Sequence, residues 1–234
     1  MSGTLYVVAT PIGHLEDITL RAIRTLKGVS VIAAEDTRHT QKLLAAYDIH
    51  TPLTSYHDFN KEEKAPVLVA RMTTGECVAL VCDAGTPTLS DPGYFLVNQA
   101  HQAGLPVSPI PGPTAAMAAL SVSGLPTDRF AFEGFLPRKS GGRARRLSDL
   151  QSDPRTLIFY ESPHRILALL DEMRDMFGDR RVVVGREMTK VFEEIIRGRI
   201  SEVAARLKAK KVRGEITLLV MGAGINHPPP ISPR

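Results

Sequence analysis

The chain has 234 residues, of which 43% are hydrophobic and 23% charged, and its formal net charge is +4. A chain of this length and composition buries a substantial core as one large or two small domains, which excludes an intrinsically disordered protein. No stretch approaches 18 apolar residues, and the N-terminus lacks the basic and apolar regions of a signal peptide, so we expect a cytoplasmic protein without a membrane segment. The two cysteines, Cys77 and Cys82, match no zinc-ligand spacing, and the sequence predicts no metal site.

Charge is distributed unevenly along the chain. Residues 1–120 contain 8 Lys and Arg against 11 Asp and Glu, whereas residues 121–234 contain 21 against 14. A basic half of this kind suits a polyanionic partner, although a solvated basic face gives the same count.

In the first half of the chain, short runs rich in valine and isoleucine alternate with segments of helical periodicity. The expected strands are residues 4–9, 29–34, 77–81 and 106–110. The expected helices are residues 19–26, 37–47, a stretch within 59–73, 94–103 and 114–122. This alternation predicts an α/β domain over residues 1–122, with a mainly parallel sheet and helical crossovers on both of its faces.

A Gly- and Pro-containing segment, residues 123–128, interrupts the alternation and is predicted to link two domains. The strands expected after it are residues 130–132, 155–160, 181–185, 192–197 and 216–221. The helices expected there are residues 143–150, 163–177 and 201–210. Because a short connection joins 182–185 to 192–197, these two strands should pair antiparallel, which predicts a mixed α/β sheet in a second domain, residues 129–225. The proline-rich residues 226–234 are predicted to form a disordered tail.

The turn after the first expected strand reads Thr10-Pro11-Ile12-Gly13. Proteins that bind NAD, or a nucleotide through a P-loop, carry a glycine-rich turn at this place, whose N–H groups cradle phosphate. Proline has no N–H to donate. The sequence therefore argues against both of these nucleotide sites.

Two later loops, residues 83–93 and 110–116, consist mainly of small, turn-forming residues. Each follows an expected strand, and ligands of open α/β sheets bind at the carboxyl ends of strands. Small residues let a ligand approach the backbone, whose carbonyl oxygens suit a cationic sulfonium. We predict a ligand site centred on Asp83-Ala84-Gly85-Thr86-Pro87, with a rigid surface turn as the alternative.

Motifs spread through the chain resemble those of a known family. In chain order they are Val8-Ala9-Thr10-Pro11-Ile12-Gly13, Ala34-Glu35-Asp36-Thr37-Arg38, Ser55-Tyr56-His57, residues 83–93, Pro111-Gly112-Pro113-Thr114, Phe135-Leu136-Pro137, Phe159-Tyr160-Glu161-Ser162-Pro163-His164-Arg165 and Gly185-Arg186-Glu187. Together they resemble the bacterial small-subunit (16S) ribosomal RNA 2′-O-ribose cytidine methyltransferases, within the tetrapyrrole-methylase superfamily. The resemblance runs from about residue 3 to residue 222. It implies two α/β domains with S-adenosylmethionine in the cleft between them, a homodimer, and methylation of a decoding-site cytidine in 16S ribosomal RNA of the assembled small subunit.

The resemblance also implies a cofactor site, which it places residue by residue at Pro11, Gly85, Thr86, Ser90, Thr114, Ala115, Tyr160 and Ile216. The chain departs from corrin and sirohaem relatives, whose first turn carries glycine-proline-glycine and whose later loop carries glycine-aspartate-proline. Here these segments read Thr10-Pro11-Ile12 and Gly85-Thr86-Pro87. This departure argues against a tetrapyrrole substrate.

Methyl transfer to a ribose hydroxyl requires alignment of oxygen, methyl and sulfur, and a general base to accept the hydroxyl proton. The candidate bases are Glu35, Asp36, His57, Glu161 and His164, of which Glu35 and His57 rank first. Several have structural alternatives. Asp36 is placed to cap the helix that begins at residue 37, Asp83 to brace its turn, Glu35 to pair with Arg38, and His57 to satisfy a turn.

Five basic residues lie within nine positions, with no acidic residue among them: Arg138, Lys139, Arg143, Arg145 and Arg146. We predict that they bind RNA phosphates, for which five contacts give a log–log salt slope of roughly −3.5 to −4.5. Gly141 and Gly142 favour a segment that becomes ordered only on binding. A solvated basic turn is the alternative, and the second basic run, residues 208–213, is interpreted as a solvated helix end.

Two other functions remain open from the sequence. One is a methyltransferase of the same superfamily that acts on a tetrapyrrole or a protein side chain, for which the basic segment 138–146 has no evident use. The other is a non-catalytic RNA-binding α/β module, which the two ligand-type loops disfavour.

Overall fold

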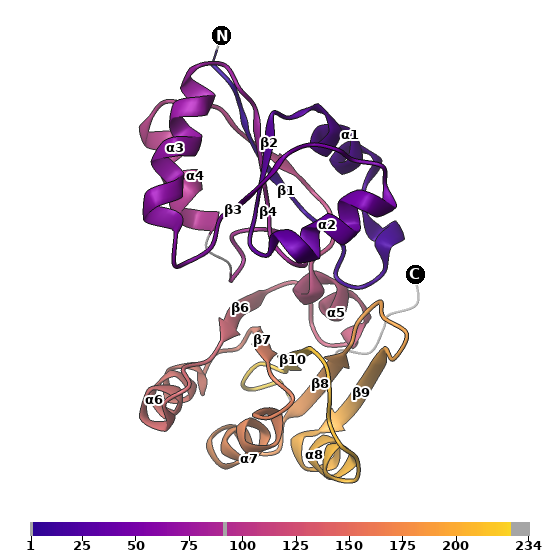
Figure 1. The fold of residues 1–234 in the computed structure, drawn as a ribbon. Coiled ribbons are helices and arrows are strands. Elements are labelled where there is room, and N and C mark those ends of the chain that lie inside the picture. Colours follow the sequence, from indigo (N-terminus) through magenta and orange to yellow (C-terminus); the bar gives the residue numbers. More distant parts are fainter. Residues whose placement is uncertain (1, 91–92, 226–234) are drawn as a thin grey trace, which may run out of the picture. The chain divides into compact units, whose positions relative to one another are not determined.

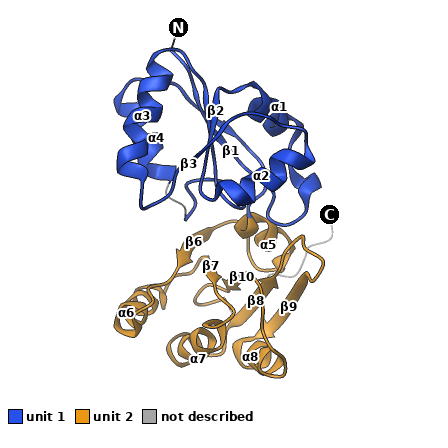
Figure 2. Ribbon diagram, in the orientation of Figure 1, with its two compact units in different colours: residues 1–114 blue, residues 115–234 orange. Residues whose placement is uncertain are grey.

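The computed structural model describes residues 2–90 and 93–225. The chain divides into two compact units, residues 1–114 and 115–234 (Figure 2). Each unit contains a five-stranded sheet, in the order β3-β2-β4-β1-β5 in the first and β6-β7-β10-β8-β9 in the second. Among the described residues, no helix is both long and apolar enough to cross a membrane. The expected tail, residues 226–234, lies outside the described residues.

All strands of the first sheet run parallel: β1 (Leu5–Val8), β2 (Val31–Ala34), β3 (Leu53–Ser55), β4 (Val78–Val81) and β5 (Val107–Ile110). Every residue of β2 and β4 is buried, as expected for central strands of a parallel sheet that is covered on both faces. The predicted parallel α/β fold is confirmed. Strand β3 was not among the strands expected from the sequence; it is a three-residue strand at the sheet edge with no fully buried residue.

Helices cover both faces of the first sheet (Figure 1). On one face, α1 (Leu20–Gly28) and α2 (Thr37–Ala46) pack their apolar sides onto alternate strand residues. On the other face, α3 (Lys61–Thr73) and α4 (Gly93–Gln102) do the same. A short 3₁₀ helix, Leu15–Asp17, precedes α1. Because all five strands are parallel, their carboxyl ends lie at one edge of the sheet.

The second sheet is mixed, as predicted. It contains β6 (Phe130–Phe135), β7 (Thr156–Glu161), β8 (Arg181–Arg186), β9 (Glu194–Arg199) and β10 (Ile216–Val220). Only β6 and β7 pair in parallel, and β8 and β9 form the expected antiparallel pair. One face is covered by α6 (Ser140–Leu150), α7 (Ile166–Phe177) and α8 (Ile200–Lys208), which lie in a row (Figure 1).

Helix α5 (Ala115–Ser123) covers the opposite face of this second sheet. Its buried residues Ala116, Ala119 and Leu120 pack against Ile158 and Val183. The two compact units therefore divide between residues 114 and 115, before α5, whereas the sequence placed a linker after it, at 123–128. Residues 123–128 belong to the second unit and are hydrogen-bonded to its sheet, since Pro126 O accepts from Thr156 Oγ1 of β7 at 2.6 Å.

Helix α6 begins at Ser140, three residues before the expected start, and includes Gly141 and Gly142. A Cβ atom at position 142 would lie 3.3 Å from Cβ of Pro137, so glycine lets the helix start close against the preceding loop. The segment is therefore a helix in this structure, and the expectation that it becomes ordered only on binding is wrong for these residues.

Candidate cofactor and substrate sites

Three loops with predicted cofactor residues lie at the carboxyl edge of the first sheet. They follow β1, β4 and β5, which are neighbours in the strand order. Thr10 and Gly85 form an isolated antiparallel bridge, in which each N–H donates to the other's carbonyl oxygen at 2.9 and 3.0 Å. The Thr10 hydroxyl also donates to Cys82 O at 3.2 Å. The structure thus brings the loop of Pro11 and the loop of Gly85 and Thr86 together.

Gly85 adopts a φ of +87°, a left-handed conformation that a side chain disfavours. A Cβ atom there would lie 3.5 Å from Ile12 Cγ2 and 3.7 Å from Pro113 O, so the three loops meet around this glycine. Thr86 Oγ1 donates to Pro113 O at 3.1 Å and ties the loop after β4 to the loop after β5. These contacts hold the loops in place through the chain's own hydrogen bonds.

Two non-glycine residues of the same loop are also left-handed, Thr88 with a φ of 78° and Ser90 with a φ of 81°. Each such residue costs about 1–2 kcal/mol, and backbone strain of this kind collects at functional sites. Ser90 is exposed, whereas Pro11 and Gly85 are buried and Thr114 is half-buried. Ala84 and the segment Pro111–Gly112 are exposed residues of the same edge.

The chemistry of this edge fits S-adenosylmethionine. At Gly112 a Cβ atom would lie 2.9 Å from Cβ of Ala9, so small residues keep the backbone segments close together. Their accessible carbonyl oxygens can face a cationic sulfonium. In the part of the chain that the structure describes, no group of three His, Cys, Asp or Glu side chains forms a metal site.

Asp83 and Asp36 link this edge to the loop after β2. Asp36 N donates to Asp83 Oδ1 at 3.0 Å, which is the bracing role expected for Asp83. Asp36 caps α2 by accepting from Arg38 N at 2.8 Å, as expected, and Arg38 Nη2 lies 2.9 Å from its Oδ2. The hydrogen bonds from Arg38 lower the pKa of Asp36 from 3.8 to about 2. A carboxylate with this low pKa, whose two oxygens both accept hydrogen bonds from Arg38, is poorly suited to accept a proton.

The two first-ranked bases follow neighbouring strands of the same sheet. Glu35 is half-buried directly after β2. His57 follows β3 and is held by Asn60 at two points. The backbone N–H of His57 donates to Asn60 Oδ1 at 2.8 Å, and the ring Nε2 of His57 lies 3.3 Å from Asn60 Nδ2. In that arrangement Nε2 is the acceptor, and the buried Nδ1 carries the hydrogen. This imidazole is occupied with its own loop.

Two other candidate bases lie in the second unit. Glu161 is 2% exposed. Its Oε1 accepts from Ser162 N at 2.7 Å and its Oε2 lies 3.1 Å from Arg165 Nη2, which gives it a structural role. His164 is exposed and precedes α7, which begins at Ile166, so it lies outside the helix.

Tyr160 and Ile216 lie at one end of the second sheet, on opposite faces. The Tyr160 ring packs against Phe132 and Phe135, with centroid distances of 5.0 and 5.7 Å. Ile216 is buried in the core beneath α6, α7 and α8, so only its backbone is available to a ligand. Thr217 is the cross-strand partner of Tyr160 and, by strand alternation, shares its face.

The five basic residues of the segment 138–146 fall into two groups. Arg143 is bound to Glu172, with its Nε 2.6 Å from Oε2, and its Nη1 donates to Arg138 O at 3.2 Å. Arg146 Nη2 lies 2.7 Å from Glu133 Oε2. Arg138, Lys139 and Arg145 are exposed, and their side chains form no ion pair within the described residues. These three are the available cations.

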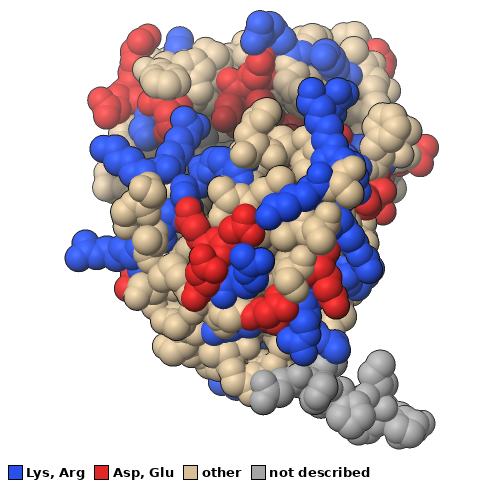
Figure 3. Space-filling model, turned by 90° about the horizontal axis from the view of Figure 1, so that it is seen from below, with Lys and Arg blue, Asp and Glu red and all other residues tan. Residues whose placement is uncertain are grey.

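Two further basic residues, at the end of α8 and just after it, are paired with carboxylates. Lys208 lies 3.3 Å from Asp171, and Lys210 pairs with Glu194. In the view of Figure 3, acidic and basic side chains are interspersed over the face. Ion pairs thus engage part of the basic side chains of the second half, although its excess of basic over acidic residues is unchanged.

Comparison with known proteins identifies the family. The model of the tetrapyrrole (corrin/porphyrin) methylases matches residues 4–204. Ribosomal RNA small subunit methyltransferase I of Pseudomonas aeruginosa is 51% identical over 224 residues, which cover 94% of this chain and 79% of that protein. The protein of the same name from Escherichia coli O157:H7 is 50% identical over 223 residues, with 94% and 78% covered.

A solved structure gives the same fold at lower identity. Uroporphyrin-III C-methyltransferase from Thermus thermophilus, complexed with S-adenosylhomocysteine, matches with a TM-score of 0.66 and 24% identity, over 94% of this chain and 97% of that one. With the parallel sheet, the mixed sheet and the edge loops in place, the chain belongs to the tetrapyrrole methylase family, and its curated relatives at about half identity are ribosomal RNA small subunit methyltransferases.

Proposed function

We propose that this protein transfers a methyl group from S-adenosylmethionine to the ribose 2′-hydroxyl of a cytidine in 16S ribosomal RNA of the small subunit. The observation that carries the proposal is identity of about 50% over 94% of the chain to methyltransferases named for small-subunit ribosomal RNA. The ribose position and the decoding-site cytidine rest on the motif resemblance from Val8 to Glu187.

The cofactor site that we propose uses the edge of the first sheet, through Pro11, Gly85, Thr86, Ser90 and Thr114, with Ala115, Tyr160 and the backbone of Ile216 as further contacts. The bridge between Thr10 and Gly85 and the bond from Thr86 to Pro113 support it, because they fix the loops before any ligand binds. When bound, S-adenosylmethionine supplies an electrophilic methyl group whose leaving group is a neutral thioether.

We assign the proton acceptor to Glu35. In the transfer, the ribose O2′ forms a bond to the methyl carbon, the carbon–sulfur bond breaks, and the hydroxyl proton passes to the carboxylate. A positioned base contributes roughly 10²–10⁴-fold to such a step. His57 is the weaker candidate, because its Nε2 faces Asn60 and its Nδ1 is buried. It is better suited to hold the loop after β3.

For the RNA, we assign phosphate contacts to Arg138, Lys139 and Arg145. Arg143 and Arg146 are occupied by Glu172 and Glu133, and they serve to hold α6 in place. With three phosphate contacts in place of five, the expected log–log slope of RNA affinity against salt concentration becomes shallower, at about −2 to −3.

We further propose that the protein is a homodimer that acts in the cytoplasm, where its ribosomal substrate is assembled. The motif resemblance implies the dimer. Support comes from large apolar side chains that the single chain leaves in solvent, among them Phe59 at 98% exposure, Val191 at 94% and Leu20 at 78%.

The direct test is to incubate the protein with methyl-labelled S-adenosylmethionine and, in parallel, with purified small subunits or a free porphyrinoid. We expect label in 16S ribosomal RNA, recovered after nuclease digestion as 2′-O-methylcytidine, and none in the porphyrinoid. A labelled porphyrinoid with unlabelled RNA would instead establish the tetrapyrrole alternative. Isothermal calorimetry that detects no cofactor binding would leave only a non-catalytic RNA-binding protein.

A further inference from the structure

A hollow in the second unit is lined by arginines that the proposed reaction does not use. Its volume is about 570 Å³, and Arg180, Arg181 and Arg199 line it together with Asp179, Phe177 and Met221. The arginines come from the loop before β8, from the first residue of β8 and from the last residue of β9. Arg180 and Arg181 are neighbours in the sequence, and the pairing of β8 with β9 brings Arg199 to them.

None of the three guanidinium groups forms an ion pair within residues 2–90 and 93–225. Arg199 Nη1 donates only to the backbone oxygen of Asp179, at 3.0 Å. Arg180 donates to two backbone oxygens, those of Phe177 at 3.2 Å and of Gln151. By contrast, Arg143, Arg155 and Arg186 each have a carboxylate partner. The hollow therefore concentrates guanidinium groups that form no ion pair with the described residues.

Arg180 is held as a partly buried cation. Its Cζ lies 4.7 Å from the centroid of the Phe177 ring, a cation–π contact that fixes the guanidinium plane. Its Nη1 is buried and has no hydrogen-bond partner among the described residues. Burial also lowers the pKa of Arg180, although a guanidinium stays charged at neutral pH. A buried N–H of a charged group without an acceptor is costly, so Arg180 is a cation at the hollow whose hydrogen-bonding capacity is not satisfied within the described residues.

Arg181 and Arg199 add a like-charge pair. They are directly opposite each other in the antiparallel ladder of β8 and β9, where like charges destabilise a sheet. Among the described residues that line the hollow, the one carboxylate is that of Asp179, which accepts from Ser201 N at 2.8 Å and from Ser201 Oγ at 2.7 Å, at the start of α8. Since Asp179 offsets one of three positive charges, the lining keeps a net charge of about +2.

We propose that this arginine hollow binds a phosphate group of the RNA backbone, as a second RNA contact besides Arg138, Lys139 and Arg145. Planar guanidinium groups match phosphate oxygens in bidentate pairs. The identity of the phosphate as RNA rests on the proposed function, whereas the binding of a phosphate group rests only on the hollow.

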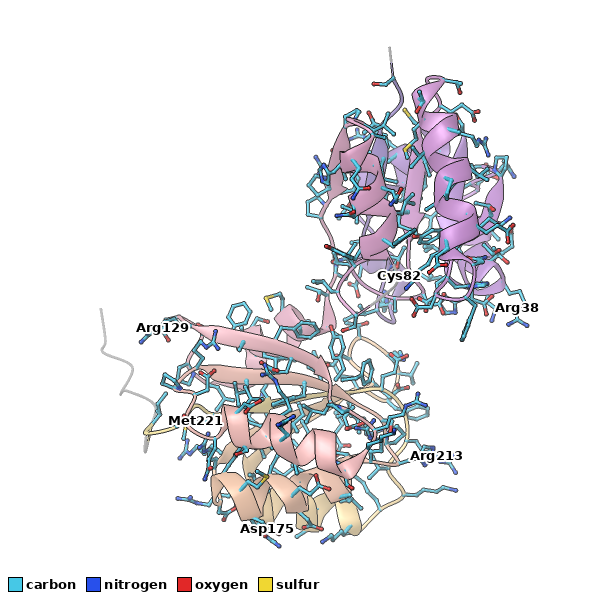
Figure 4. All side chains as sticks on the ribbon, turned by 90° about the vertical axis from the view of Figure 1, so that its left-hand side faces the viewer. Arg38, Cys82, Arg129, Asp175, Arg213 and Met221 are labelled. Carbon is cyan, nitrogen blue, oxygen red and sulfur yellow. The ribbon has the colours of Figure 1, made fainter. Side chains whose placement is uncertain are left out.

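The position of the hollow suits an extended polyanion. Met221, which lines it, and Arg213 lie at opposite ends of the second unit (Figure 4). Consistently, Met221 N bonds to Arg181 O at the start of β8, whereas Arg186 at its end bonds to Arg213 O. Tyr160 and the loop before α6 lie at that far end, because Phe135 pairs with Tyr160. A six-residue strand spans about 20 Å, so one mononucleotide cannot reach both RNA contacts.

The first experiment tests phosphate binding without RNA. The variants are Arg181→Gln with Arg199→Gln and, as a charge-matched control, Arg206→Gln with Lys211→Gln, two exposed residues of the second unit outside the hollow. We expect inorganic phosphate to raise the Tm of the parent and the control above its value in chloride of equal ionic strength. The hollow variant should lose most of that shift. An equal phosphate shift in all three proteins would overturn the proposal, since phosphate also stabilises proteins by exclusion.

The second experiment measures the affinity for purified small subunits over a series of salt concentrations. We expect roughly tenfold weaker binding for the hollow variant and a salt slope smaller by about 0.7–0.9, with the control unchanged. An unchanged slope in the hollow variant would overturn the assignment to RNA, even if free phosphate binds. If the parent methylates no ribosomal RNA, the proposed function fails, while the phosphate experiment still decides whether the hollow is an anion site.

Discussion

Arg143 and Arg145 are two residues apart in α6, yet their side chains have different surroundings. Arg143 is 13% exposed and bound to Glu172, whereas Arg145 is exposed and forms no ion pair in the described part of the chain. The hydrogen bond from Arg143 lowers the pKa of Glu172, so this carboxylate is ionised at neutral pH. Spacing along the sequence grouped these arginines, and only their contacts separate them.

Arg143→Ala should therefore weaken the fold more than the affinity for RNA. We expect the free energy of unfolding to fall by roughly 1–2 kcal/mol, because Glu172 loses its partner. Urea denaturation measures this loss, and the same pair should stabilise less as the pH falls below the ordinary Glu value of 4.5. Arg145→Ala is the matched control, with stability within about 0.5 kcal/mol of the parent and severalfold weaker small-subunit binding. The reverse pattern would restore Arg143 as a phosphate contact.

The second prediction at the scale of one residue concerns a substitution of Gly85. Gly85→Val places a branched side chain at a φ of +87° within contact of Ile12 and Pro113, so the loop must shift. We expect a stability loss of roughly 1–2 kcal/mol and at least tenfold weaker S-adenosylmethionine binding by calorimetry. Gly104→Val is the control, since Gly104 has a φ of +66° and open space around it, between α4 and β5. It should lose similar stability and keep its cofactor affinity. Normal cofactor binding by folded Gly85→Val would remove this loop from the site.

At the scale of the elements, the sequence contains the residues that cap a helix, but it does not indicate which sheet a helix packs against. Thr19 caps α1 by accepting from Ala22 N at 3.1 Å, and Asp36 caps α2, as turn and cap residues predict. Helix α5 reads Ala-Ala-Met-Ala-Ala-Leu-Ser-Val-Ser, apolar on almost every side. Its periodicity therefore indicates no single face, and the sheet it covers was decided by tertiary packing.

The cap of α2 gives a pH prediction. Arg38 lowers the pKa of Asp36 to about 2, below the value of 3.8 expected in the unfolded chain. The stabilisation from this ionised cap is thus fully present above about pH 4 and is lost as the pH falls toward 2. In an NMR titration of side-chain carboxyl carbons, Asp36 should titrate near 2, and Arg38→Gln should raise its pKa toward 3.8. Arg155→Gln, which removes the partner of Asp153, should leave Asp36 unchanged. An unaltered Asp36 midpoint in Arg38→Gln would contradict this account.

At the scale of the whole molecule, the number of basic residues in the basic half overstates the number of cations that are free to meet a partner. Arg143, Arg146, Arg155 and Arg186 are engaged by carboxylates. Cations without a carboxylate partner among the described residues gather in two places, the loop before α6 and the arginine hollow, and Arg206 and Lys211 are further exposed examples. Long-range attraction of RNA should depend on these two places, and it should weaken as salt shortens the reach of the charges.

The proposed homodimer is tested at the same scale. Sedimentation equilibrium should give twice the chain mass of 25.5 kDa at micromolar concentration. The physical reason is that exposed apolar side chains such as Phe59 and Val191 are stabilised by burial against a second copy. A single species of 25.5 kDa over the whole concentration range would show that the chain acts as a monomer.

The sequence by itself determined the α/β class, nearly all strands and helices, and the loops of small residues after β1, β4 and β5, because periodicity, caps and turn residues are local properties. Motifs in a fixed order also determined the family. Tertiary structure alone decided that α5 belongs to the second sheet, that Arg143 and Glu161 are engaged in ion pairs, and that Thr217 shares a face with Tyr160. It also brought Arg180, Arg181 and Arg199 around one hollow. Apart from the neighbours Arg180 and Arg181 and the pair Glu161 and Arg165, the residues in these relations are far apart in the chain, and strand pairing and packing bring them together.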